Sequence, residues 1–299
     1  PLCGAVIRAL HEAVDDQADK ARFHGYMPEC GAPFLREAIA DHYARRGVTL
    51  APDEVFVSSG ASDELGDILD LFDCSSTALV IEPAYPAYVD ANVLAGRRIL
   101  HLSSGEENGF LPEPDERLCA DLIYICSPNN PTGAVFGRDK LQRWVDYANH
   151  RGAVILFDAA YEAFIEDPAL PHRIFELDGA RTCAIEICSL SKTAGFTGTR
   201  LGYTVIPKEL ERGGLRPNDM WVRNRTTKTN GVSYILQKGG AAVFTPEGQR
   251  QVRENIQVYK ANAKMLTDAL DALGVWYCGG KNAPYIWMKC PKKKKKKNS

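Results

Sequence analysis

The sequence lacks the features that would place it in a membrane or mark it for export. Its 299 residues contain no uninterrupted apolar run near the ~18 residues that a membrane-spanning helix requires. The first residues show no succession of charged, apolar and small residues typical of a signal peptide. Neither a GxGxxG nor a P-loop sequence is present, which disfavours a nucleotide-binding oxidoreductase. We therefore expect a protein that is neither exported nor membrane-bound.

Cysteine is present, but not in a pattern that binds metal or builds a disulfide framework. The nine cysteines form no CxxC pair and no zinc-like cluster with histidine, and their number is odd. Several lie inside apolar runs such as LIYICS (122–127) and CAIEICS (183–189), as reduced core thiols do. We expect no metal site and a reducing compartment: the cytoplasm, or a plastid if the source is a photosynthetic eukaryote.

Charge of one sign is concentrated only at the end of the chain. The formal net charge is −2, and without the six lysines at 292–297 the chain would carry 30 basic and 38 acidic side chains. Such a run can bind nucleic acid or an anionic membrane, but no aromatic residues or second basic patch accompany it. Lysine is encoded by all-adenine triplets, so residues 292–299 are more typical of a disordered tail or a translated poly-A artefact. We expect no nucleic-acid or membrane partner.

Short apolar runs rich in β-branched residues alternate with segments of helical periodicity. With 45% hydrophobic and 25% charged residues, the chain is long enough for one large globular domain and a smaller piece. The alternation predicts an α/β fold whose mostly parallel sheet is covered by helices on both faces. The predicted strands are 54–59, 77–83, 97–102, 121–128, 153–161, 183–191, 201–207 and a last one within 283–290. The predicted helices are 5–14, 34–46, 62–72, 85–96, 138–152 and a long one over 246–273.

The segment SLSKTAGFTGTR (189–200) carries an unusual lysine. Lys192 lies among hydroxyl and glycine residues, and Arg200 follows eight positions later. An ordinary surface lysine lies on a helix among other charges and needs neither feature. Because ligands of open α/β sheets collect beyond the carboxyl ends of strands, the residues that follow the other strands are candidates for the same site.

Three other strand ends carry selective residues. Ala61 and Ser62 open a helix after a strand and offer free N–H groups to an anion such as phosphate, although an ordinary helix cap has the same sequence. SPNNPTG (127–133) presents two amides between prolines, although it also suits a simple turn. Asp158 ends an apolar strand three residues before Tyr161, and for this buried acid we expect a positively charged partner.

One cofactor accounts for these parts together. Pyridoxal phosphate needs a lysine for its Schiff base, a carboxylate to keep its ring nitrogen protonated, and an anion cradle for its phosphate. Lys192 and Asp158 match the first two needs, and Ala61 and Ser62 with Arg200 match the third. The hydroxyls of Ser189 and Ser191 add candidate phosphate contacts.

The motifs also resemble a known family. SPNNPTG, FDAAYEAF (157–164) and SLSKTAGFTGTRLGYTVIPKEL (189–210), in this order and spacing, are similar to the aspartate aminotransferase superfamily of fold-type I pyridoxal phosphate-dependent transferases. FHGYMPECG (23–31), EPAYPAYVD (82–90) and TNGVSYILQKGG (229–240) resemble, within it, the LL-diaminopimelate aminotransferases most closely. The resemblance covers nearly the whole chain up to Met288.

The resemblance implies roles for the matching positions. Lys192 would hold the cofactor and shuttle the proton of the substrate Cα, and Asp158 would pair with the pyridine nitrogen. Asn130 and Tyr161 would bond the phenolic oxygen, and Tyr85 would stack on the ring. The residues around the phosphate would be Ala61, Ser62, Ser189, Ser191 and Arg200. The residues contributed across a homodimer interface would be Tyr26, Glu29 and Asn230, with Tyr26 and Glu29 reading the substrate.

The chain also departs from the family pattern. It enters its lysine run where family members continue to an arginine that clamps the substrate carboxylate, and it begins after an N-terminal glycine-containing segment that lines the substrate pocket. Ser62, Thr229 and Tyr234 replace, respectively, a lysine, an aromatic residue and an asparagine that are usual in the family. We expect a fragment in which cofactor binding survives better than turnover.

These expectations define a domain division and a reaction. The predicted parts are an N-terminal arm with part of a small domain (1–25), a large cofactor-binding domain (26–254), a truncated small domain (255–291) and the tail (292–299). The implied reaction moves an amino group between glutamate or 2-oxoglutarate and LL-diaminopimelate or its cyclic precursor tetrahydrodipicolinate, in lysine biosynthesis. Alternatives are another aminotransferase or C–S lyase of the same fold, and a non-catalytic aminotransferase-like binding protein.

Overall fold

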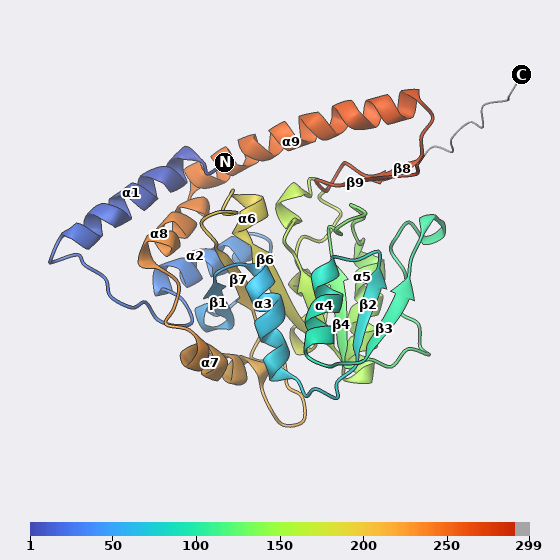
Figure 1. Cartoon of the computed structure of the whole chain (residues 1–299), viewed down its shortest axis with the longest axis horizontal. Coiled ribbons are helices and arrows are strands. Elements are labelled where there is room, and N and C mark those ends of the chain that lie inside the picture. The colour runs from blue at the N-terminus through green and yellow to red at the C-terminus, as the bar shows by residue number, and fades with distance from the viewer. Residues whose placement is uncertain (291–299) are drawn as a thin grey trace, which may run out of the picture.

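The computed structural model describes residues 1–290, and the predicted lysine-rich tail at 292–299 lies outside the described residues. Its centre is a seven-stranded sheet in the order β1-β7-β6-β5-β4-β2-β3 (Figure 1). Only β7 runs antiparallel to its neighbours β1 and β6. The strands are β1 (Val55–Ser58), β2 (Ala78–Glu82), β3 (Ile99–Ser103), β4 (Leu122–Cys126), β5 (Val154–Asp158), β6 (Ala184–Ser189) and β7 (Gly202–Val205). The predicted α/β fold with a mostly parallel sheet is therefore confirmed.

Helices cover both faces of this sheet, as the uninterrupted apolar strands require. Alternate residues of each strand point to opposite faces, so Val57 and Phe56 of β1 belong to two different buried clusters. The first cluster joins the sheet to α2 (Pro33–Ala44), α5 (Arg138–Arg151) and α8 (Tyr234–Val243). The second joins it to α3 (Ala61–Asp67), α4 (Pro86–Leu94) and α7 (Pro217–Lys228).

Two further helices lie outside these layers. α1 (Gly4–Ala18) packs against α8 and against α9 (Pro246–Ala272), which spans the molecule in Figure 1 from the N-terminus to the hairpin described below. Pro246 starts α9, and the Thr245 hydroxyl accepts a hydrogen bond from Gly248 N at 3.1 Å. The prediction of a long helix over 246–273 is correct to within one residue.

The end of the described chain is a hairpin, where the sequence predicted one strand. β9 (Ile286–Met288) matches the predicted run, and β8 (Tyr277–Gly279) pairs with it antiparallel. β8 was not predicted because only three residues of GVWYCGG (274–280) are extended, and the last of them is itself a glycine that another glycine follows. The remaining short elements are α6 (Leu190–Thr193) and the 3-10 turns η1 (Pro52–Glu54), η2 (Ile68–Leu71), η3 (Glu106–Asn108), η4 (Glu162–Phe164), η5 (Ile174–Glu176) and η6 (Ala180–Thr182).

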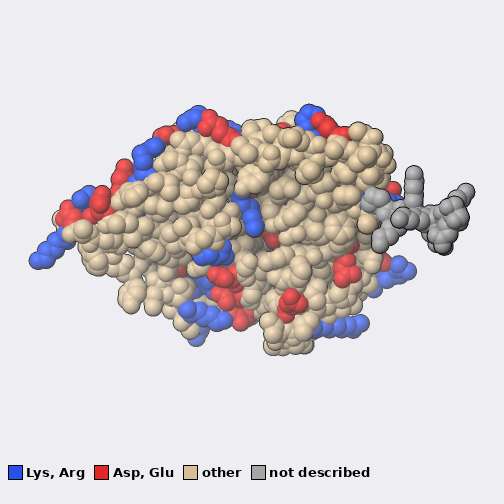
Figure 2. Space-filling model, turned by 45° about the horizontal axis from the view of Figure 1, so that its top comes forward, with Lys and Arg blue, Asp and Glu red and all other residues tan. Residues whose placement is uncertain are grey.

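The surface mixes charges of both signs. On the face in Figure 2, Lys and Arg side chains lie close to Asp and Glu side chains, with broad uncharged areas between them. Among residues 1–290, no helix is long and apolar enough to cross a bilayer. The same residues contain no group of three or more His, Cys, Asp or Glu side chains able to hold a metal ion.

Candidate active site

The carboxyl ends of β4, β5 and β6 bring the predicted residues together. In the parallel register Cys126 lies opposite Asp158, and Asp158 opposite Ile187, so the segments that follow these strands share one edge of the sheet. A cavity of about 320 Å³ opens at this edge. Its lining includes all ten residues predicted for the cofactor within one chain: Ala61, Ser62, Tyr85, Asn130, Asp158, Tyr161, Ser189, Ser191, Lys192 and Arg200. We call it the lysine cavity.

Lys192 lies where the lysine cavity meets a second one. α6 begins at Leu190, and its cap residue Ser189 accepts a hydrogen bond from Ser191 N at 3.2 Å. The side chain of Lys192 is exposed, and it also lines an adjoining cavity of about 310 Å³. A single amine can therefore reach both a molecule in the lysine cavity and one beside it.

Asp158 is buried, and two hydrogen bonds hold its carboxylate within the chain. Tyr88 Oη donates a hydrogen bond to Oδ2 at 2.6 Å, and Ala160 N donates to Oδ1 at 3.0 Å. Burial raises the pKa of Asp158 above its usual value, and these two bonds and the Lys192 charge lower it in part. Two hydrogen bonds thus hold the carboxylate in the wall of the lysine cavity, and Lys192 is the positive charge that acts on it within the chain.

Tyr88 was not among the predicted site residues, although its spacing from Tyr85 in the sequence could have indicated it. Tyr85 caps α4 and Tyr88 lies three residues later, which places both on one side of the helix. Their rings meet edge to face with centroids 5.6 Å apart, and Tyr88 stacks on Tyr124 at 5.0 Å. The spacing in EPAYPAYVD could have indicated that both tyrosines face the sheet edge.

An anion cradle lies at one end of the lysine cavity. Arg200 Nη1 donates to Ser191 Oγ at 3.1 Å and to Thr197 O at 3.3 Å. Asp63 N and Glu64 N both bond Gly60 O, which leaves the N–H groups of Ala61 and Ser62 without a helical acceptor. Gly60 has a φ of +133°, which favours glycine, and a Cβ there would lie 2.5 Å from Arg200 Nη2, so the guanidinium lies directly against this helix start.

The opposite end of the lysine cavity is polar but uncharged. Asn129 Nδ2 donates to Thr132 Oγ1 at 2.8 Å and so holds the loop 127–133, whereas the Asn130 amide makes no hydrogen bond within residues 1–290. Tyr161 Oη lies 2.6 Å from Tyr285 Oη. Tyr285 was not predicted, and neither were the other lining residues Leu65, Ala160 and Thr197.

The three residues predicted to cross a dimer interface lie elsewhere. Tyr26, Glu29 and Asn230 do not line the lysine cavity of their own chain. Tyr26 is 88% exposed, and Asn230 is also exposed. The two segments nevertheless touch, since a Cβ at Gly231 would lie 2.6 Å from Met27 O and 2.9 Å from Pro28 O. The structure thus brings the two segments together, with Tyr26 and Asn230 exposed and Glu29 half-buried.

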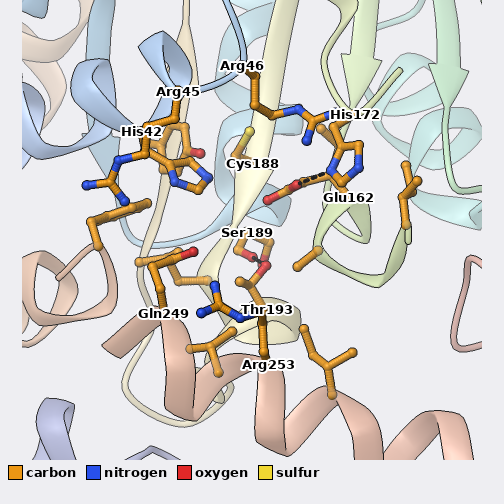
Figure 3. A pocket seen from close by; sticks show the side chains of 18 of the residues that line it. His42, Arg45, Arg46, Glu162, His172, Cys188, Ser189, Thr193, Gln249 and Arg253 are labelled. Carbon is orange, nitrogen blue, oxygen red and sulfur yellow. Dashed lines mark hydrogen bonds and ion pairs between the residues drawn. The ribbon is translucent and has the colours of Figure 1, made fainter. Parts of the chain in front are cut away.

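A larger cavity of about 520 Å³ lies beside the site and offers different chemistry (Figure 3). Glu162, on its wall, pairs with His172 at 3.3 Å and with Arg173 at 2.9 Å. Burial alone would raise the pKa of Glu162, but Arg173 and His172 outweigh burial and hold it at about 2. Burial lowers the pKa of His42 to about 4, so this imidazole is neutral near pH 7. This cavity has no lysine in its wall and cannot form a Schiff base.

The donor set of the lysine cavity fits pyridoxal phosphate. An amine, a buried carboxylate and an anion cradle surround a space of about 320 Å³, and Tyr85 supplies an aromatic wall. Asp158 ends β5, Lys192 lies in α6 and Arg200 lies in the segment between α6 and β7, so their convergence is a property of the fold. No other cavity described in residues 1–290 combines these groups.

Comparison with known proteins agrees with this geometry. The family model for aminotransferase class I and II matches residues 2–299. Proteins named LL-diaminopimelate aminotransferase from Lawsonia intracellularis and Prochlorococcus marinus are each 49% identical to this chain, over 97% of it and 75% of their own length. A solved structure titled L,L-diaminopimelate aminotransferase from Chlamydomonas reinhardtii superposes with a TM-score of 0.91 at 38% identity, covering 98% of this chain and 75% of that one. The chain therefore belongs to the class I and II aminotransferases, and it is an enzyme of the pyridoxal phosphate-dependent transaminase type.

Proposed function

We propose that this chain moves an amino group between LL-diaminopimelate and a keto acid, with pyridoxal phosphate bound in the lysine cavity. The observation that carries the proposal is the convergence of Lys192, Asp158 and Arg200 on one cavity of matching size. The substrate is inferred from relatives at 45–49% identity, which bear the name LL-diaminopimelate aminotransferase. Glutamate and 2-oxoglutarate complete the proposed exchange.

The cofactor, when bound, supplies an electron sink for the charge that develops at the substrate Cα. Lys192, which lines both cavities, would move the proton between the substrate Cα and the cofactor's C4′. Asp158 keeps a proton on the ring nitrogen, and its hydrogen bonds to Tyr88 and Ala160 hold the carboxylate in place. Arg200 and the start of α3 bind the phosphate.

The remaining lining residues orient the ring. Tyr161 and Asn130 donate to the ring oxygen, and Tyr85 stacks on one face. Ser189 and Ser191 contribute to the phosphate site, with Ser191 Oγ already held by Arg200. We expect these lining residues to speed the reaction mainly by holding the reacting groups in one geometry.

A homodimer with shared sites accounts for the surface group of Tyr26, Glu29 and Asn230. Tyr26 is 88% exposed, so its side chain is free to contact a second copy. The packing of Gly231 on Met27 and Pro28 makes the three residues one unit. In a second copy this unit would enter the lysine cavity, where Tyr26 would contact the substrate and Glu29 would bind the distal ammonium of the diamine.

The test is the visible absorption spectrum of the purified chain with pyridoxal phosphate, before and after adding LL-diaminopimelate. We expect a Schiff-base band that Lys192→Ala abolishes and that the diamine bleaches while other amino acids do not. Lys264→Ala is the matched control, because Lys264 pairs with Asp268 on the exposed side of α9.

Two outcomes would contradict the proposal at different points. A lysine-dependent band that bleaches with another amino acid, and not with the diamine, would replace the proposed substrate. A spectrum that is the same in the parent chain and in Lys192→Ala would overturn the cofactor site.

A further inference from the structure

The β8–β9 hairpin packs closely on the loop that carries Asn130. Tyr285 O accepts a hydrogen bond from Gly280 N at 2.7 Å, which closes the hairpin. A Cβ at Gly279 would lie 2.3 Å from Tyr285 O and 2.9 Å from Thr132 O, and a Cβ at Gly133 would lie 2.6 Å from Tyr285 O. Two glycines thus allow the backbone of the hairpin to touch the backbone of the loop 127–133.

A second contact ties the hairpin to the segment that follows Tyr161. Asn282 Oδ1 accepts hydrogen bonds from Glu166 N at 3.0 Å and from Asp167 N at 3.2 Å. Ala283, next to it, is buried. The connection between β8 and β9 is therefore anchored on the same segment that carries Tyr161.

Tyr285 projects from this anchored connection into the site. Its ring meets that of Tyr161 edge to face with centroids 5.1 Å apart, and the two hydroxyl oxygens are 2.6 Å apart. Tyr285 lines both the lysine cavity and the adjoining cavity, and Tyr161 does the same. Among the described residues of the hairpin, Tyr285 is the one whose side chain contacts a residue predicted to bind the cofactor.

We propose that Tyr285 is a positioning residue that acts on the cofactor through Tyr161. This inference rests on the proposed function, in which Tyr161 donates its proton to the ring oxygen of pyridoxal phosphate. A tyrosine hydroxyl has one proton, so a Tyr161 that donates to the cofactor accepts from Tyr285. The two hydroxyls then form a directed chain from Tyr285 to Tyr161 to the ring oxygen, and each bond polarises the next.

Through its backbone, Tyr285 also contacts the loop that carries Asn130, the second residue proposed to donate a hydrogen bond to the ring oxygen. Its carbonyl lies against Gly133, in the loop that presents Asn130, while its hydroxyl holds Tyr161. One residue therefore sets the position of both groups proposed to bond the ring oxygen.

The expected consequence is spectroscopic. A donor at the ring oxygen withdraws electron density and makes the neighbouring imine nitrogen less basic. Loss of the Tyr285 hydroxyl weakens that donor, so the pKa of the lysine–cofactor imine rises. A hydrogen bond of ordinary strength corresponds to a shift of roughly half a unit to one unit.

The experiment is a pH titration of the visible band for four loaded proteins: the parent chain, Tyr285→Phe, Tyr161→Phe and the double variant. We expect both single variants to raise the midpoint, with the larger shift in Tyr161→Phe. The double variant should match Tyr161→Phe, because the Tyr285 hydroxyl acts through Tyr161 and the substitution leaves the backbone contact with Gly133 in place. Tyr277→Phe on β8, whose hydroxyl lies 3.2 Å from Asp271 at the surface, is the matched control and should titrate like the parent.

Three results would overturn the inference. They are an unchanged midpoint in Tyr285→Phe, a Tyr285→Phe shift that persists in the Tyr161→Phe background, and an equal shift in Tyr277→Phe. If the proposed function is wrong, the result is different: the parent chain itself then shows no absorption band that depends on Lys192.

Discussion

Tyr88 Oη donates a 2.6 Å hydrogen bond to Asp158 Oδ2, and this bond joins the second helix-covered face of the sheet to the floor of the lysine cavity. Both residues are buried, at 3% and 6% exposure. An ionised carboxylate in such surroundings is stable only when its oxygens accept hydrogen bonds. Tyr88 therefore connects the packing of the fold to the charge state of its central acid.

Tyr88→Phe should destabilise the protein in a pH-dependent way. Hydrogen bonds to charged groups contribute about 1.5–3 kcal/mol to the free energy of unfolding, and this one acts while Asp158 is ionised. Because burial raises the pKa of Asp158, the carboxyl becomes neutral on acidification sooner than an exposed aspartate, and the cost of the substitution then shrinks. Urea unfolding at pH 5 and pH 8 measures this difference. Tyr124→Phe, whose hydroxyl bonds Asn92 and no carboxylate, is the control and should cost the same at both values.

Gly60→Ala should weaken pyridoxal phosphate binding and also strain the backbone, because Gly60 has a φ of +133°. The added Cβ would lie 2.5 Å from Arg200 Nη2 and would displace the guanidinium from the start of α3. Loss of one charge-assisted contact corresponds to an affinity decrease on the order of ten-fold or more. Fluorescence titration with the cofactor measures it. Gly66→Ala, in α3 with open space around it, should bind like the parent, and equal affinities for the two variants would refute the steric argument.

Glu162→Gln should remove stability that is present only above acidic pH. The folded pKa of Glu162 is about 2, below its usual 4.5 because of Arg173 and His172. A lowered carboxyl pKa contributes stability above the unfolded pKa, and that contribution falls as the pH drops from about 4.5 to 2. We expect a loss of about 3 kcal/mol at pH 7 that declines below pH 4.5. Chemical unfolding across this range measures it, with Glu116→Gln at an exposed ion pair as the near-neutral control.

Mixing two inactive variants should restore activity if sites are shared between copies. In a heterodimer of Lys192→Ala and Asn230→Ala chains, one site carries both defects and the other carries neither. Random exchange makes half of the dimers mixed, so about a quarter of the parent activity should return. Activity assays on co-refolded and separately refolded chains compare the two conditions. Full inactivity of the co-refolded mixture, with dimers demonstrated by sedimentation, would place Asn230 in its own chain's site.

The strands and the long helix followed from the sequence because their signals are local. LIYIC and VILFD are continuous apolar runs, and Pro246 at the start of a periodic segment marks the beginning of α9. The structure also brings the ten residues predicted for the cofactor to one cavity, since residues after parallel strands share an edge of the sheet. β8 was missed because three residues with partial exposure leave no period to detect.

The sequence by itself determined the sheet, the helices that cover it and the chemistry of Lys192, because apolar periodicity and residue type act within a few positions along the chain. Only the tertiary structure decided that Tyr88 donates a hydrogen bond to Asp158, and that Tyr285 meets Tyr161 across 124 positions. Those partners depend on how β4, β5, α4 and the hairpin pack, and a hydrogen bond between distant residues leaves no periodicity in the sequence. The same packing set Tyr26, Glu29 and Asn230 together at the surface, outside the cavity of their own chain.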